Sequence, residues 1–232
     1  MHAHHHEKHF RQSDLVKDIV IGLSDGLTVP FALAAGLSGA VHDNSIIITA
    51  GIAEIIAGSI AMGLGGYLAG RTEIEHYDSE LKREYDEIRD FYEKERQEVK
   101  DIFAEYGLSP ASQEIIIDEL SKDHDKWVDF MMRFELGLDK PDAKRARNSA
   151  LNIGGAYIVG GVIPLLGYIF TSEPNIGLIY SSVITIVCLL TFGFLKSRVT
   201  GQPPLAGALK TAAIGLLAAT AAYGIAKLVG KI

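Results

Sequence analysis

Five apolar stretches, each about as long as a helix that crosses a bilayer, constrain this chain more than any other feature. A hydrocarbon core about 30 Å thick needs roughly 20 apolar residues in a helix. Helices buried in a soluble protein usually keep a polar stripe, and the third and fourth stretches have none of any width. The sequence therefore predicts an all-α membrane protein with five transmembrane helices, at about 19–41, 46–70, 150–170, 176–195 and 205–228.

Basic residues collect on one side of this arrangement. The short connections 42–45 and 171–175 contain no Lys or Arg, whereas the other connections and the N-terminal region contain many. The positive-inside bias places that basic side in the cytoplasm, although Lys227 and Lys231 run mildly against it. The predicted parts are a cytoplasmic tail (1–18), transmembrane helices 1–2 (19–70), a cytoplasmic insert (71–147) and transmembrane helices 3–5 (148–232).

The first apolar stretch is not expected to be a cleavable signal peptide. The stretch is longer than the apolar part of a signal peptide and lacks a cleavage site. The start, MHAHHHEKHF, is either a native metal-binding tail or a tag remnant. The single Cys188 excludes an internal disulfide framework, and its apolar surroundings favour a packing role.

Two carboxylates interrupt the apolar stretches. Asp25 lies in the first and Glu54 in the second, and the central stretches contain no Lys or Arg to pair with them. A charge at the centre of a bilayer costs a few kcal/mol, so such a group normally faces a cavity, a partner or an ion. Met62, eight residues after Glu54, projects from roughly the same helix face, with Gly58 between them. This pattern indicates a cation pathway through Asp25, Glu54 and Met62.

A structural explanation of the same residues stays open. Glu54 could be protonated and hydrogen-bonded inside a helix bundle, and Met62 alone is typical of core filling. The motif from Gly66 to Gly70 permits close helix packing or dimerisation. Pro30 and Pro164 are expected to kink or break their helices and to free carbonyl groups.

The insert 71–147 is acidic, with 22 acidic and 14 basic residues. From residue 71 to 106 it has no Gly or Pro, which predicts a long helix that extends the second span, with a break near Asp90 and Phe91. Two further helices are expected at 112–122 and 126–136.

Acidic side chains of the insert recur at helical spacing. Glu84 and Glu87, like Glu95 and Glu98, are three residues apart, and Glu135 follows Met131 and Met132 by one turn. Most such runs are solvated faces supported by ion pairs along one helix. Carboxylates together with thioethers, however, suit a transition metal better than Mg²⁺ or Ca²⁺. Fe²⁺, Mn²⁺, Co²⁺ and Zn²⁺ would all fit.

Several motifs in order along the chain resemble the vacuolar iron transporter family of plants, fungi and bacteria. They include SDGLTVPFALAAGL from Ser24, AE at Ala53, MGLGGYL from Met62, LKRE from Leu81, FMM from Phe130, FELGL from Phe134 and GVIPLL from Gly161. Further matches are EKHF from Glu7 and AEYG from Ala104. The resemblance covers nearly the whole chain.

The resemblance implies a homodimer with five transmembrane helices per subunit. It implies a secondary transporter rather than an enzyme, which exports cytosolic Fe²⁺ and often Mn²⁺ in exchange for protons, across a vacuolar or bacterial inner membrane. No prosthetic group and no nucleic-acid partner are expected. By matching position, Asp25, Glu54 and Met62 would line the pathway, and Glu84, Glu87, Glu95, Glu98, Met131, Met132 and Glu135 would form a cytoplasmic metal site.

Two alternatives remain from other functional classes. One is a membrane-tethered iron-storage or ferroxidase-like protein, because ferritin-like sites also use glutamates on helices. Those sites need two Glu-x-x-His pairs, and the insert offers only Glu73 with His76. The other is a membrane scaffold that senses metal without moving it.

Overall fold

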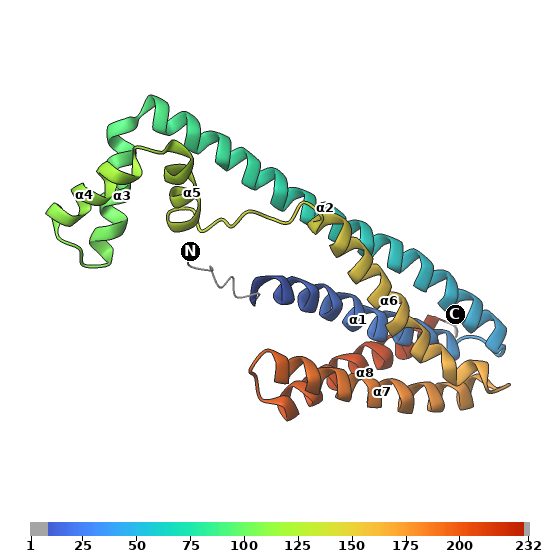
Figure 1. Cartoon of the computed structure of the whole chain (residues 1–232). Coiled ribbons are helices and arrows are strands. Elements are labelled where there is room, and N and C mark those ends of the chain that lie inside the picture. Colours follow the sequence, from blue (N-terminus) through green and yellow to red (C-terminus); the bar gives the residue numbers. More distant parts are fainter. Residues whose placement is uncertain (1–8, 230–232) are drawn as a thin grey trace, which may run out of the picture. The chain divides into compact units, whose positions relative to one another are not determined.

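The computed structural model describes residues 9–229, with side chains from residue 14 onward, and the regular elements among these residues are all helices. Residues 1–8 of the predicted tail 1–18 lie outside the described residues, and residues 9–18 form the first turns of α1. Figure 1 shows the helices in chain order. They are α1 (His9–Ser38), α2 (Asn44–Asp90), α3 (Tyr92–Glu105), α4 (Pro110–Leu120), α5 (His124–Phe134), α6 (Arg145–Ile169), α7 (Pro174–Val199) and α8 (Pro204–Val229).

Five of the described helices, α1, α2, α6, α7 and α8, are long and apolar enough to cross a membrane. The prediction of an all-α protein with five candidate membrane spans is confirmed, whereas the cytoplasmic side of the insert stays a prediction. α1 and α6 continue through Pro30 and Pro164, so neither proline breaks its helix, and the expected kink stays a prediction. Both prolines are buried among neighbouring helices, which is how membrane helices accommodate the lost hydrogen bond.

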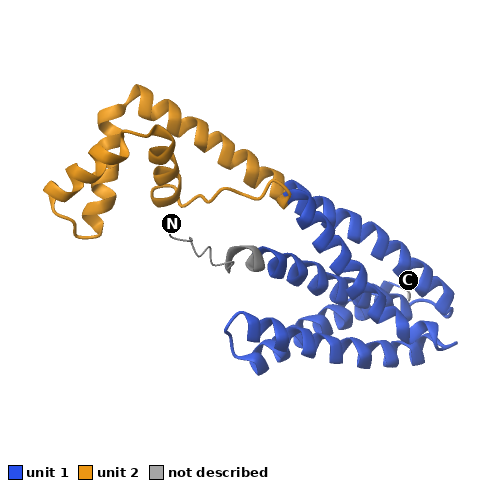
Figure 2. Ribbon diagram, viewed as in Figure 1, with its two compact units in different colours: residues 1–68, 146–232 blue, residues 69–145 orange. Residues whose placement is uncertain are grey.

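The chain divides into two compact units (Figure 2): residues 1–68 with 146–232, and residues 69–145. In α8 of the first unit, small side chains face inward and large apolar ones face outward. For example, Ala212 and Gly215 are buried while Leu217 is 71% exposed. This pattern is typical of helices that pack through small residues and present apolar side chains to lipid.

The ends of three helices in the first unit are tied by polar contacts. The hydroxyl groups of Ser38 and Tyr168 lie 2.8 Å apart. The Asn44 side chain donates hydrogen bonds to the carbonyl oxygens of Tyr168 (3.1 Å) and Thr171 (2.7 Å). These contacts fix the turn between α1 and α2 against the end of α6.

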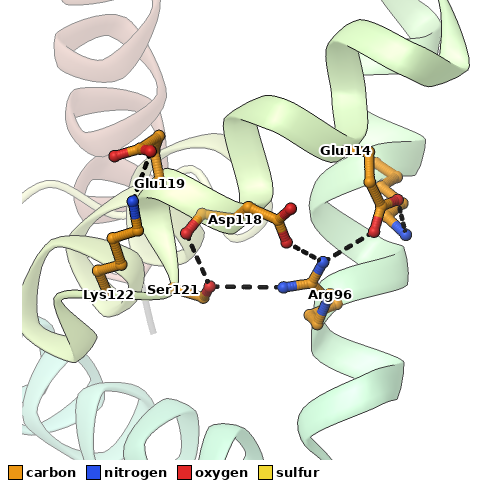
Figure 3. A network of polar contacts seen from close by, with 7 residues as sticks. Arg96, Glu114, Asp118, Glu119, Ser121 and Lys122 are labelled. Atoms are coloured by element: carbon orange, nitrogen blue, oxygen red, sulfur yellow. Dashed lines mark hydrogen bonds and ion pairs between the residues drawn. The ribbon is translucent and has the colours of Figure 1, made fainter.

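The second unit has its own apolar core, centred on the fully buried Trp127. The sequence break near Phe91 is present, since α2 ends at Asp90 and α3 begins at Tyr92. An ion network ties α3 to α4: the Arg96 guanidinium contacts Glu114 (2.9 Å) and Asp118 (2.6 Å), as Figure 3 shows. This network holds α4 against α3.

Candidate metal sites

An intramembrane carboxylate lies where two helices of the first unit meet. Glu54 of α2 is half-buried, and the hydroxyl of Tyr157 in α6 donates a hydrogen bond to its Oε1. Its second oxygen, Oε2, is buried and has no hydrogen-bond partner within the described residues. A buried carboxylate oxygen without a partner is costly. This oxygen is therefore available to a proton or a metal ion.

Two glycines allow Tyr157 to reach this position. A Cβ atom at Gly58, one turn after Glu54, would lie 2.5 Å from the Tyr157 hydroxyl. A Cβ atom at Gly26 of α1 would lie 2.4 Å from the Tyr157 carbonyl oxygen. Asp25, the neighbour of Gly26, is half-buried on α1. The structure thus brings Glu54 to Tyr157, and it places Asp25 next to the glycine at which α1 approaches the Tyr157 backbone.

The third predicted pathway residue, Met62, is half-buried on α2 two turns after Glu54. Its role as a ligand stays a prediction. Sequence reasoning missed Tyr157, which lies 103 residues from Glu54 and has no periodic pattern that links the two. The one local signal was Gly58, which leaves room for a bulky partner beside Glu54.

A second group of acids gathers in the other unit. Carboxylate oxygens of Glu84, Glu95 and Glu135 lie within 4.8 Å of one another. Glu84 and Glu95 are 1% and 0% exposed, whereas Glu135 is exposed. Glu84 lies in α2, Glu95 lies in α3, and Glu135 is the C-cap residue directly after α5. Three oxygen ligands from three segments can coordinate a divalent cation.

Burial and mutual repulsion make this cluster unfavourable when all three acids are ionised. Burial, reinforced by the carboxylates of Glu135 and Glu95, raises the pKa of Glu84 to about 7. Burial, together with the Glu98 carboxylate, raises the pKa of Glu95 to about 7. Burial and the same Glu98 carboxylate also raise the pKa of Glu135. A bound cation would relieve this repulsion.

The remaining predicted residues of the site lie at its edge or in the core. Glu87 is 3.8 Å from Arg83, and Glu98 accepts a hydrogen bond from Lys94 at 2.8 Å. Met131 and Met132 are fully buried in the apolar core around Trp127. Packing therefore accounts for both methionines, and their role as ligands stays a prediction.

Comparisons with known proteins show the family to which this chain belongs. A family model described as the VIT family matches residues 16–227. The chain belongs to the VIT family. The resemblance found in its motifs is confirmed, and together with the five apolar helices it identifies an integral membrane protein.

Named relatives of this VIT-family protein span nearly its whole length. Vacuolar iron transporter 1 of Oryza sativa subsp. japonica is 51% identical over 98% of this chain and 91% of its own. Vacuolar iron transporter 1 of Arabidopsis thaliana is 53% identical over 97% and 90%. Protein CCC1 of Saccharomyces cerevisiae is 39% identical over 93% and 69%.

The metal-free VIT-family protein is expected to lose stability in its second unit as pH rises. The pKa values of Glu84 and Glu95 are raised to about 7 in the folded state, above their ordinary value of 4.5. Their contribution is therefore most favourable below the ordinary value and is lost as pH rises through 7. Thermal unfolding with a chelator, followed by the fluorescence of Trp127, the only tryptophan, checks this. An unfolding temperature that rises over this range would contradict it.

Proposed function

We propose that this protein carries Fe²⁺, and also Mn²⁺, out of the cytosol in exchange for protons, into a vacuole or across the cell membrane. Co²⁺ and Zn²⁺ are plausible further cargo. The observation that carries the proposal is Glu54, an acid in an apolar helix with one oxygen held by Tyr157 and the other buried without a partner in the described residues. The relatives named as vacuolar iron transporters support the choice of metal.

The carboxylates of the pathway carry out both halves of the exchange. Asp25 and Glu54 bind the ion when they are ionised, and they take protons from the far side as the ion leaves. Tyr157 holds one oxygen of Glu54, which fixes where the other oxygen meets the ion. Met62 adds a soft ligand that discriminates against Mg²⁺ and Ca²⁺.

The cluster of Glu84, Glu95 and Glu135 collects metal on the cytosolic side. Glu87 and Glu98 add negative charge at its edge. Because Glu84 and Glu95 retain protons near pH 7, a metal ion displaces protons on binding. We therefore expect the affinity of this site for metal to increase with pH across the cytosolic range.

Removing the hydroxyl group of Tyr157 is expected to slow transport. Tyr157→Phe keeps the ring between Gly26 and Gly58 but deletes the hydrogen bond to Glu54. A hydrogen bond to a charged group contributes about 1.5–3 kcal/mol, which corresponds to a roughly tenfold or greater loss of rate. Tyr180→Phe, at an exposed tyrosine of α7, is the matched control. Equal flux in both variants and the wild type would show that Tyr157 has no part in transport.

The protein is expected to act as a homodimer whose subunits meet near α2. One subunit offers a dehydrated ion few ligands, and two-fold symmetry doubles them. An apolar face of α2 is exposed in the single chain, at Ile56, Ile60, Leu64 and Leu68. Leu68→Cys should therefore cross-link to its own copy, whereas Cys188 of α7 should not. A strong cross-link through Cys188, or none through the residue introduced at 68, would contradict this interface.

A membrane-tethered iron-storage protein is the second candidate, and the glutamate cluster of the second unit favours it. That cluster contains no histidine, unlike the ferritin-like sites that pair Glu with His. Metal flux into proteoliposomes separates the two functions. A transporter fills the vesicle lumen with metal well beyond its own molar amount, whereas a storage or sensing protein binds metal without filling the lumen.

A further inference from the structure

Basic residues at one end of the α7–α8 hairpin have no acidic counterpart. Lys196 and Arg198 lie in the last turn of α7, and Lys210 lies in the second turn of α8. The sequence contains no Asp or Glu after Glu173. In the part of the chain that the structure describes, none of the three forms an ion pair. Within the described residues of the first unit, no carboxylate therefore neutralises their charge.

In the insert, by contrast, basic side chains form ion pairs with carboxylates. Arg83, Arg96 and Lys100 each lie within 4 Å of a carboxylate, and Arg96 contacts two (Figure 3). Exposed pairs of this kind contribute little to stability, but they neutralise charge. The hairpin end lacks even this neutralisation.

A close helix crossing brings the three cations to the same end of the hairpin. A Cβ atom at Gly207 of α8 would lie 1.7 Å from the Ser197 hydroxyl oxygen of α7, so only glycine allows this approach. The first turns of α8 therefore pack directly against the last turns of α7. Exposed apolar side chains flank the cations, with Val199, Leu205 and Leu209 each more than half exposed.

The helix macrodipole explains only part of this arrangement. Lys196 and Arg198 stabilise the C-terminal end of α7, where cations are favoured. Lys210 lies in the N-terminal part of α8, where the dipole does not favour a cation. The positive-inside bias places such a cation at the cytosolic surface, where anionic lipid headgroups lie.

We propose that this end of the α7–α8 hairpin binds the headgroup of an anionic phospholipid. Lys196, Arg198 and Lys210 contact the phosphate, and the acyl chains lie against Val199, Leu205 and Leu209. Long basic side chains reach a headgroup from the edge of a membrane helix while their methylene groups stay in apolar surroundings. A soluble phosphate would use the cations but would leave the apolar rim without a partner. With the orientation expected from the positive-inside bias, the lipid lies in the cytosolic leaflet.

Titration of the purified protein in detergent, read by native mass spectrometry, tests this. The probes are phosphatidylglycerol and phosphatidylcholine of the same chain length. Each basic residue near an anionic surface contributes about 1 kcal/mol, or roughly fivefold in affinity. Replacing all three by glutamine should therefore weaken phosphatidylglycerol binding about 100-fold and abolish its preference over phosphatidylcholine. Lys227→Gln, which removes a cation near the other end of α8, should change nothing.

Two further arms keep the outcome decisive. If the triple variant does not fold, Arg198→Gln and Lys210→Gln taken singly should each weaken phosphatidylglycerol binding about fivefold. Unchanged binding in these variants would overturn the proposal. Inorganic phosphate is the competitor that separates lipid from a soluble anion. If millimolar phosphate displaces phosphatidylglycerol completely, the site binds a soluble anion and the lipid proposal is wrong. None of these readouts depends on metal transport.

Discussion

Replacing Glu54 by glutamine is expected to abolish metal transport while the protein still folds. Glutamine keeps the shape of the side chain and can still accept the hydrogen bond from Tyr157 at the position of Oε1. It loses the negative charge that binds a divalent ion. It also cannot take up a proton from the far side of the membrane when the ion leaves. Uptake of Mn²⁺ or Fe²⁺ into proteoliposomes should fall to the level of protein-free vesicles.

The control for this variant changes an acid that the pathway does not use. Glu173→Gln alters the same charge in the exposed connection between α6 and α7. Its flux should match the wild type. Glu54→Ala should be as inactive as Glu54→Gln, since the ligand and not the packing volume is at issue. Wild-type flux in Glu54→Gln would remove Glu54 from the mechanism.

Replacing Glu84 and Glu95 together by glutamine is expected to weaken metal binding and to stabilise the metal-free second unit. Both acids are buried beside other carboxylates, so each ionised side chain costs free energy unless a cation is bound. The double variant removes two of the three oxygen ligands and also the repulsion. Metal affinity measured by calorimetry should fall at least tenfold, on the order of 1.4 kcal/mol or more.

A gain in stability of the metal-free protein, together with a loss of metal affinity, distinguishes a binding site from a solvated face. The Trp127 fluorescence of the metal-free double variant should report a higher unfolding temperature than the wild type at about pH 8, and the pH dependence should flatten. Glu105→Gln with Glu119→Gln, two exposed acids of the same unit, gives the same charge change as a control. If both double variants bind metal like the wild type, the acids of the insert form only a solvated face.

The transmembrane helices could be predicted from the sequence because the length of an apolar run is a local property. The break at Phe91 was also visible, where two charge-rich segments meet. Spacing along a helix is also a local property, and it indicated Glu84 and Glu95 as candidate ligands. Which acids meet is a tertiary property, so the choice of Glu84, Glu95 and Glu135 over Glu87 and Glu98 needed the structure.

Contacts between distant segments were beyond the sequence. Tyr157 lies in a helix that reads as uniformly apolar, and its hydrogen bond to Glu54 depends on how α2 and α6 cross. The two methionines show the reverse case. Met131 and Met132 stood at the right spacing from Glu135, yet both lie in the apolar core around Trp127. A thioether fits either role, and spacing alone does not separate them.

Simultaneous recording of metal and proton movement in the same proteoliposomes tests the central claim most directly. Vesicles that contain the wild-type protein, a metal-sensitive dye and a pH-sensitive dye are given Fe²⁺ or Mn²⁺ outside, with no initial pH gradient. Proton-coupled exchange predicts that metal enters while the lumen becomes more alkaline, and that both signals vanish together in Glu54→Gln. Metal entry with no change in lumenal pH, in the absence of other permeant ions, would contradict proton-coupled exchange.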